Sequence, residues 1–195
     1  MGLVDRAKNI LLKPNEEWQV IAAEEPNAGA IITGYVIPLA ILSAVAGAIG
    51  SFLLMSSAGM AIATAVFGLI SAVISVLVAS AVVNALAPTF NSEQNFGRAV
   101  QLVAYSYTAG LVGGILQIIP VAGSILAFLV GLYGIYLMYL GLPVVMKTPD
   151  DKRIVYMIIA FVALFLVGMI LAMIFGALMI TMGLGFAGAA GAFGS

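Results

Sequence analysis

The polar side chains that could do chemistry in this sequence lie within long apolar segments. Their amide and phenol groups can exchange hydrogen bonds with a neutral solute, but they are not the usual acids, bases or nucleophiles of enzymes. They could line a polar cavity in a membrane, or they could form hydrogen bonds between helices, typically under about 2 kcal/mol each. We favour hydrogen bonds between helices and keep the cavity as the alternative. The four side chains of this predicted polar face are Gln101, Tyr105, Gln117 and Tyr136.

Catalytic chemistry has little support in the rest of the sequence. Histidine and cysteine are absent, which removes imidazole bases, thiol nucleophiles, disulfides and the usual zinc ligands. The predicted spans hold none of the ionisable side chains that proton-coupled pumps place in the membrane. Acidic pairs at 16–17, 24–25 and 150–151 match no metal-binding loop and are interpreted as solvated charge. We therefore predict no enzyme, no cofactor and no metal site.

Composition indicates an integral membrane protein. Of 195 residues, 64% are hydrophobic and 8% are charged, whereas about 25% are charged in typical soluble domains. A net charge of -1 provides no broad basic surface, so nucleic acid is not an expected partner. The expected partners are the lipid bilayer and, further, other membrane proteins or a second copy of the chain.

The predicted elements are helices long enough to cross a bilayer. About 20 apolar residues at a rise of about 1.5 Å per residue span a hydrocarbon core of about 30 Å. The sequence predicts an all-α, polytopic membrane helical bundle: five transmembrane helices preceded by short amphipathic interfacial helices. The third span is the most polar and is expected inside the bundle, and Pro38 predicts a kink or a local break in the first. The predicted domain, 28–181, contains spans at approximately 31–55, 60–85, 99–119, 123–146 and 154–181.

The two ends of the chain differ from this domain. Residues 1–27 form a predicted amphipathic segment, which either lies on the membrane surface or packs on the bundle. Trp18, the only tryptophan, is predicted to be an interfacial anchor, because its ring is apolar and its edge can donate a hydrogen bond. Residues 182–195 are rich in glycine and alanine and are interpreted as a flexible tail.

The basic residues predict the orientation. They fall before the first span, between the second and third, and between the fourth and fifth, so five spans place all of them on one side. The positive-inside rule then predicts a multi-pass protein of the cell (plasma or inner) membrane, with a cytoplasmic amino terminus and a carboxyl terminus outside the cytoplasm. These residues are Arg6, Lys8, Lys13, Arg98, Lys147, Lys152 and Arg153.

Small residues recur on the spans at helical spacing, which is typical of close packing between membrane helices. Such patterns serve packing within one chain or between copies, and we favour packing within the chain. The predicted helix-packing glycines are Gly110, Gly114, Gly123, Gly131, Gly168 and Gly176.

Three stretches carry a resemblance to a known family. They are the entry Arg6–Pro14 with Glu17 and Trp18; Phe96–Arg98 leading to Tyr105–Tyr107; and Ile119–Pro120 followed by Leu132–Leu137 and Gly141–Pro143. In their order and spacing the chain resembles a small prokaryotic member of the Yip1 domain family. The resemblance implies a non-enzymatic membrane protein with five spans. Eukaryotic relatives act in early secretory traffic and associate with small GTPases through a longer amino-terminal region and an Asp-Leu-Tyr-Gly-Pro motif. The sequence has neither feature, so no GTPase partnership is assumed.

Two functions remain open at this point. The first is a membrane-organising or adaptor role through contacts with lipid or membrane proteins, motivated by charge that is confined to one side. The alternative is a passive pore or carrier for a small neutral or amphipathic solute along the third and fourth helices.

Overall fold

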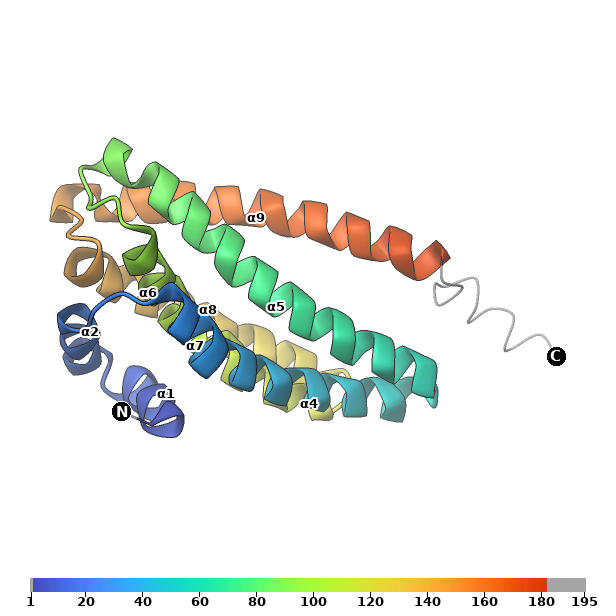
Figure 1. Ribbon diagram of the computed structural model, residues 1–195. Helices are drawn as coiled ribbons and strands as arrows, with labels where there is room; N and C mark the ends of the chain where they lie inside the picture. The colour runs from blue at the N-terminus through green and yellow to red at the C-terminus, as the bar shows by residue number, and fades with distance from the viewer. Residues whose placement is uncertain (1, 182–195) are drawn as a thin grey trace.

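The computed structural model describes residues 2–181, and this part of the chain is helical with no strand. Two short helices, α1 (Leu3–Leu12) and α2 (Pro14–Ala23), precede the long ones. The long helices lie side by side in one elongated bundle (Figure 1). Five of them are long and apolar enough to cross a membrane, which confirms the predicted fold class. The predicted tail, 182–195, lies outside the described residues.

The five spans consist of ten helical elements in the described chain. They are, in order, α3 (Ala28–Ile31), the π-helix η1 (Ile32–Val36) and α4 (Ile37–Met55); α5 (Ala58–Leu86) and the 3₁₀-helix η2 (Ala87–Phe90); α6 (Phe96–Ser106), α7 (Thr108–Gly113) and the 3₁₀-helix η3 (Gly114–Ile118); α8 (Ala122–Val145); and α9 (Asp150–Thr181).

The first span changes its helical winding just before Pro38. Proline has no backbone N–H, and its ring collides with the carbonyl four residues earlier in a regular α-helix. The chain accommodates it with the wider turn η1, in which the Ile37 N–H donates to the carbonyl oxygen of Ile32. At the start of the span, Asn27 Oδ1 accepts a hydrogen bond from the Ala30 N–H at 2.9 Å. The irregularity predicted at Pro38 is therefore a π-turn.

The third span is the centre of the bundle. Of its most apolar stretch 72% is buried, against 7% for the fifth span, so the prediction that it lies inside is confirmed. The span is not one continuous α-helix: it breaks at Tyr107, between α6 and α7, and tightens into η3. Its carboxyl-terminal half is rich in glycine, which favours helix weakly. Tyr107 therefore lies between two helical segments, outside both of them.

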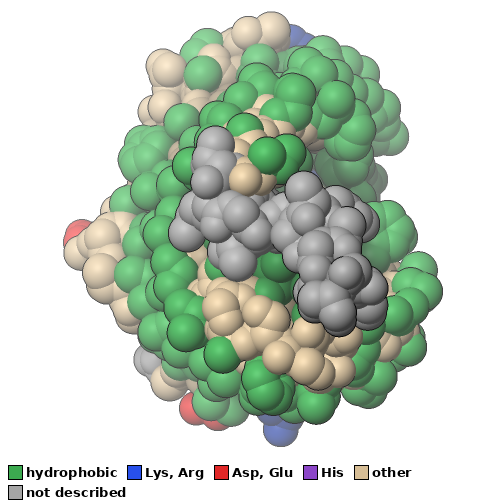
Figure 2. Space-filling model, turned by 90° about the vertical axis from the view of Figure 1, so that its right-hand side faces the viewer, with side chains coloured by type: hydrophobic (Ala, Val, Ile, Leu, Met, Phe, Trp, Pro, Cys, Tyr) green, Lys and Arg blue, Asp and Glu red, His purple; other side chains and the backbone are tan. Residues whose placement is uncertain are grey.

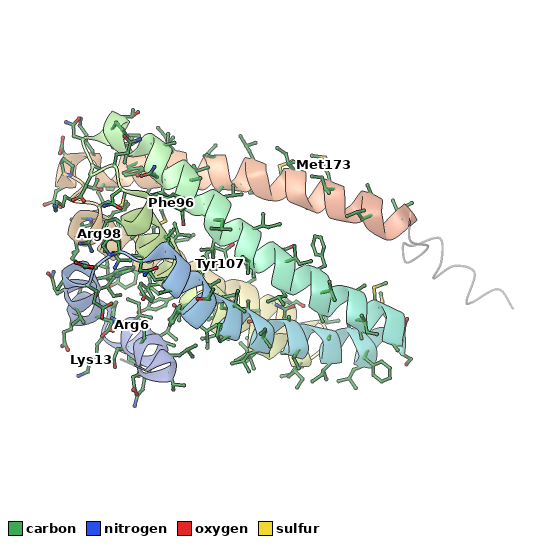
Figure 3. All side chains as sticks on the ribbon, in the orientation of Figure 1. Arg6, Lys13, Phe96, Arg98, Tyr107 and Met173 are labelled. Atoms are coloured by element: carbon green, nitrogen blue, oxygen red, sulfur yellow. The ribbon has the colours of Figure 1, made fainter. Side chains whose placement is uncertain are left out.

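Charged residues gather at one end of the bundle. We call the end formed by α1, α2 and residues 91–95 and 147–153 the charged end, and the end at 56–57 and 119–121 the uncharged end. Arg6, Lys13 and Arg98 all lie at the charged end (Figure 3). The uncharged end shows mainly hydrophobic side chains, with charged atoms only at the rim of the view (Figure 2).

The two amino-terminal helices pack on the bundle. Ala7 and Ile10 of α1 and Ile21 of α2 are buried. The Tyr133 hydroxyl of α8 donates to the carbonyl oxygen of Leu11 at 3.0 Å. Both helices therefore pack against protein on one face, and their other faces are exposed.

Candidate functional site

A buried arginine joins α1 to the rest of the charged end. Arg6 is 5% exposed, and its Nη1 donates to Glu17 Oε1 of α2 at 2.6 Å. Its Nη2 donates to Glu24, just after α2. The guanidinium also lies over the Tyr105 ring of α6, 5.4 Å from the ring centroid. One side chain therefore connects three helical elements.

Arg98 connects the end of α2 to α6. Its Nη1 donates to the carbonyl oxygens of Ala22 and Glu24, both at 3.0 Å, and to Gln101 Oε1 at 2.9 Å. Gln101 Nε2 donates to the carbonyl oxygen of Ile21 at 3.3 Å. The last carbonyls of a helix lack partners within that helix and carry partial negative charge, so a cation there is favourable. We call Arg6, Glu17, Glu24, Arg98 and Gln101 the arginine cluster.

Two tyrosines connect the arginine cluster to the membrane-spanning part of the bundle. Tyr105 packs edge to face on Tyr35 of η1, with ring centroids 4.8 Å apart. The Tyr35 hydroxyl shares a buried hydrogen bond of 2.7 Å with Thr108 Oγ1. Beside these rings is a hollow of about 290 Å³, lined among others by Arg6, Gln101 and Tyr105. The π-turn of the first span thus supplies one wall of the charged-end hollow.

Trp18 lies inside the protein. Its ring is fully buried, and a Cβ added to Gly141 of α8 would lie 2.8 Å from it and 2.6 Å from Leu102. Its Nε1 has no hydrogen-bond partner. The anchor interpretation required the ring to face the lipid headgroups, whereas the structure places it between α2, α6 and α8.

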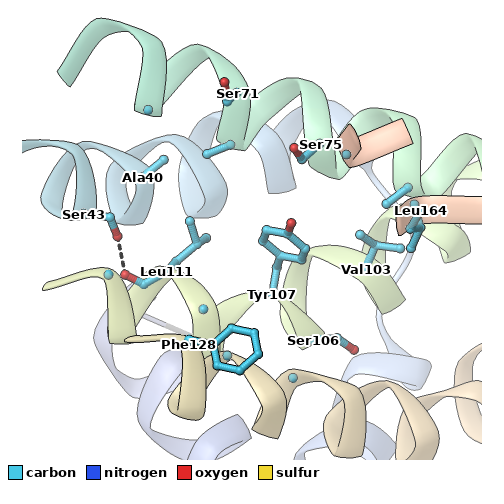
Figure 4. A pocket seen from close by; sticks show the side chains of 18 of the residues that line it. Ala40, Ser43, Ser71, Ser75, Val103, Ser106, Tyr107, Leu111, Phe128 and Leu164 are labelled. Carbon is cyan, nitrogen blue, oxygen red and sulfur yellow. Dashed lines mark hydrogen bonds between the residues drawn. The ribbon is translucent and has the colours of Figure 1, made fainter. Parts of the chain in front are cut away.

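A larger cavity lies deeper, within the membrane-spanning part. It has a volume of about 650 Å³ and is bounded by α4, α5, α6, α7, η3, α8 and α9. Tyr107 projects into its middle, and its hydroxyl points toward Ser75 of α5 (Figure 4). The neighbouring Ser106 also lines the cavity, and its Oγ is buried without a hydrogen-bond partner. The polar residues lining the cavity are Ser43, Thr64, Ser71, Ser75, Ser106, Tyr107 and Gln117.

The structure separates the four side chains of the predicted polar face. Gln101 and Tyr105 line the charged-end hollow, and Gln117 lines the deeper cavity. Tyr136 lines neither; it is 46% exposed, and its ring lies 5.5 Å from that of Tyr133. Sequence reasoning missed Tyr107. The available signal was its spacing, because it lies three and seven residues before two cavity-lining glycines of the same span.

The predicted packing glycines have contrasting surroundings. A Cβ on Gly114 would lie 2.8 Å from the Ser43 side chain, and one on Gly123 would overlap the carbonyl oxygen of Leu116. Within the described residues, a Cβ on any of the other four would meet no heavy atom within 4 Å. These four are Gly110, Gly131, Gly168 and Gly176.

The described residues contain no group of three or more acidic side chains that could hold a metal ion. Hydrogen bonding, ion pairing and hydrophobic contact are the interactions that these two hollows offer. A family model described as the Yip1 domain matches residues 8–172, which include four of the five spans in full and most of the fifth. The chain belongs to the Yip1 domain family. No curated protein and no solved structure matches it. As a member of the Yip1 domain family with five apolar spans, it is a multi-pass membrane protein.

Proposed function

We propose that this protein is a non-enzymatic membrane-organising adaptor that engages lipid or another membrane protein through its charged end. The observation that carries the proposal is the arginine cluster, which fixes α1 and α2 in one position against the bundle. A buried cation with two carboxylates is sensitive to misplacement, because an unpaired buried charge costs several kcal/mol. The cluster therefore supports a rigid, preorganised surface, which loses less conformational entropy on binding than a mobile segment would.

The outer face of α1 and α2 supplies the proposed contact surface. Lys8 and Gln19 are exposed there, together with the apolar side chains Val4 and Leu12, which are 73% and 69% exposed. A mixed apolar and charged surface suits either the headgroup region of a bilayer or a partner at that level. By the positive-inside rule this face is cytoplasmic.

The alternative, a passive pore or carrier, has less support. Its predicted path required Gln101 and Gln117 to face one hollow, and they line different ones. Leu102 and Leu137, on the two helices of that path, are fully buried. Replacing Gln101 and Gln117 together with leucine is expected to leave solute flux in proteoliposomes unchanged, and a loss of flux would restore the alternative.

Site-specific photocrosslinking tests the adaptor proposal. A photoreactive residue at Lys8 or Gln19, in the full chain in native membranes, is expected to yield a recurrent adduct of one lipid or one protein. The matched control is Val121, 66% exposed at the uncharged end, which should not give that adduct. Arg6→Met should weaken the adducts at both positions. Recovery of only the protein itself, or the same adduct from Val121, overturns the proposal.

A further inference from the structure

We infer that the cavity around Tyr107 is a binding site for an uncharged lipid whose polar group is a carbonyl or a hydroxyl. This goes beyond the proposed function, because the charged end can act as an adaptor whether or not the cavity binds lipid. The cavity volume of about 650 Å³ falls within the range of about 300–1,000 Å³ typical of small-molecule sites. Protein interiors otherwise contain few voids larger than a water molecule.

The lining excludes a charged occupant. Among the described residues that line the cavity there is no aspartate, glutamate, lysine or arginine. An ion there would lack a counter-charge in surroundings where an unpaired charge is costly. Most of the lining is apolar, with aromatic side chains such as Phe128, Phe161 and Phe165. The chemistry therefore fits hydrocarbon chains.

Two hydroxyls at the middle of the cavity are placed to hydrogen-bond a ligand. Ser43 already donates to the carbonyl oxygen of Leu111, and Thr64 Oγ1 donates to Ser51 Oγ at 3.3 Å. Tyr107 and Ser75 face each other across the middle of the cavity (Figure 4). Two hydroxyls can donate to a carbonyl or exchange hydrogen bonds with a hydroxyl. The ligand that fits is mainly hydrocarbon with a neutral polar group.

Access to the cavity is from the lipid side. Phe161, Leu164 and Phe165 of α9 form part of its wall. Phe161 and Phe165 are 50% and 61% exposed. Few residues of α9 are buried by the rest of the described chain. A lipid can therefore enter sideways past α9 without crossing the charged end.

Glycines keep part of this space open. Gly110 of α7 and Gly131 of α8 both line the cavity, and a Cβ on either would meet nothing within 4 Å. A larger side chain at these positions would extend into the cavity without striking the backbone. Leucine also favours helix more than glycine does. Gly110→Leu and Gly131→Leu are thus expected to fill the cavity and keep the fold.

The test is photoaffinity labelling of the full chain in phosphatidylcholine nanodiscs. The probe is a diacylglycerol with a diazirine on one acyl chain, compared with phosphatidic acid carrying the same chain. The diacylglycerol is expected to label cavity residues such as Tyr107 and Phe128. Gly110→Leu and Gly131→Leu should each reduce this labelling about tenfold, equivalent to about 1.4 kcal/mol of binding free energy. Gly176→Leu is the matched control: its Cβ also has open space, it does not line the cavity, and labelling should not change.

A second variant leaves the cavity volume almost unchanged. The double substitution Tyr107→Phe and Ser75→Ala removes both hydroxyls and should abolish the preference for diacylglycerol over a diazirine-bearing alkane. Equal cavity labelling by phosphatidic acid overturns the proposal. So does labelling that the leucine variants leave unchanged, or adducts spread evenly over lipid-facing residues. Loss of the charged-end adducts of the adaptor experiment would leave this result untouched.

Discussion

At the charged end, Arg6 and Arg98 bond to side chains and carbonyls from other helices, whereas in the middle of the bundle Tyr107 projects into a cavity. Both regions use polar groups within an apolar protein. In the arginine cluster the polar groups are satisfied by one another, and they fix the positions of α1, α2 and α6. Around Tyr107 several hydroxyls share a largely apolar wall with open space beside them. The first arrangement serves rigidity, and the second leaves room for a ligand.

The glycines near the charged end and those around the cavity also differ in how closely they are packed. Gly141 lies against Trp18 and Leu102 near the charged end, where any added carbon would collide. Gly110 and Gly131 line the cavity and face open space. A small residue in a membrane helix therefore marks close packing in one region and an unfilled volume in the other, and spacing alone does not distinguish them.

Replacing the buried Arg6 is expected to have the largest effect on the rigid charged end. Arg6→Met leaves Glu17 buried without its partner, and breaking such a pair costs about 3–5 kcal/mol. The expected result is faster amide hydrogen exchange throughout α1 and α2, with α8 and α9 unchanged. Adding Glu17→Gln should recover part of the loss, because it removes the unpaired charge.

The matched control for this change is Lys13→Met. Lys13 Nζ lies 3.9 Å from Glu16 Oε2, and both side chains are exposed. The loss of unfolding free energy should therefore stay below about 1 kcal/mol. Equal exchange in the Arg6 and Lys13 variants would show that the cluster does not hold the two helices in place.

Gly131 and Gly134 lie three residues apart on one face of α8, and they allow a close-packed glycine to be compared with one that faces open space. A Cβ on Gly134 would lie 2.8 Å from the carbonyl oxygen of Ser106, at the break in the third span, whereas one on Gly131 meets nothing. Gly134→Ala should lower the unfolding free energy by about 1–3 kcal/mol, because backbone must shift. Gly131→Ala should be neutral or raise it by up to about 1 kcal/mol through helix propensity. Unfolding in mixed detergent and SDS measures both, and equal effects would contradict the packing described for α8.

The smallest expected effect is at the loop contact between Glu93 and Lys147. Lys147 Nζ lies 2.6 Å from Glu93 Oε2, and the Lys147 side chain is 75% exposed. This bond holds the pKa of Glu93 below its ordinary value of 4.5. A lowered pKa in the folded state means that the stabilisation is present above the ordinary value and is lost as the pH falls through the lowered one.

Glu93→Gln should therefore cost less than about 1 kcal/mol at neutral pH. The cost should disappear at a pH well below 4.5, where the wild-type carboxylate is protonated. Lys147→Gln should give the same profile, and the double variant should add nothing. A cost that persists in acid would assign the effect to another contact, such as the Glu93 N–H bond to the Met146 carbonyl oxygen at 2.7 Å.

The sequence determined the five spans, the central place of the third and the gathering of charge at one end. It could do so because hydrocarbon cannot satisfy backbone N–H and C=O groups, so long apolar segments must be helical whatever their neighbours. The irregularity at Pro38 was predictable for a similar local reason, since the missing donor belongs to the proline itself.

Only the tertiary structure decided which helical faces meet. Trp18 is buried because Gly141, far away in the sequence, leaves room for its ring. Gln101 and Gln117 line different hollows, and the helices that bound each hollow come from distant parts of the sequence. Helical periodicity fixes which residues share a face, but the rotation and distance of each helix come from packing against segments elsewhere in the chain.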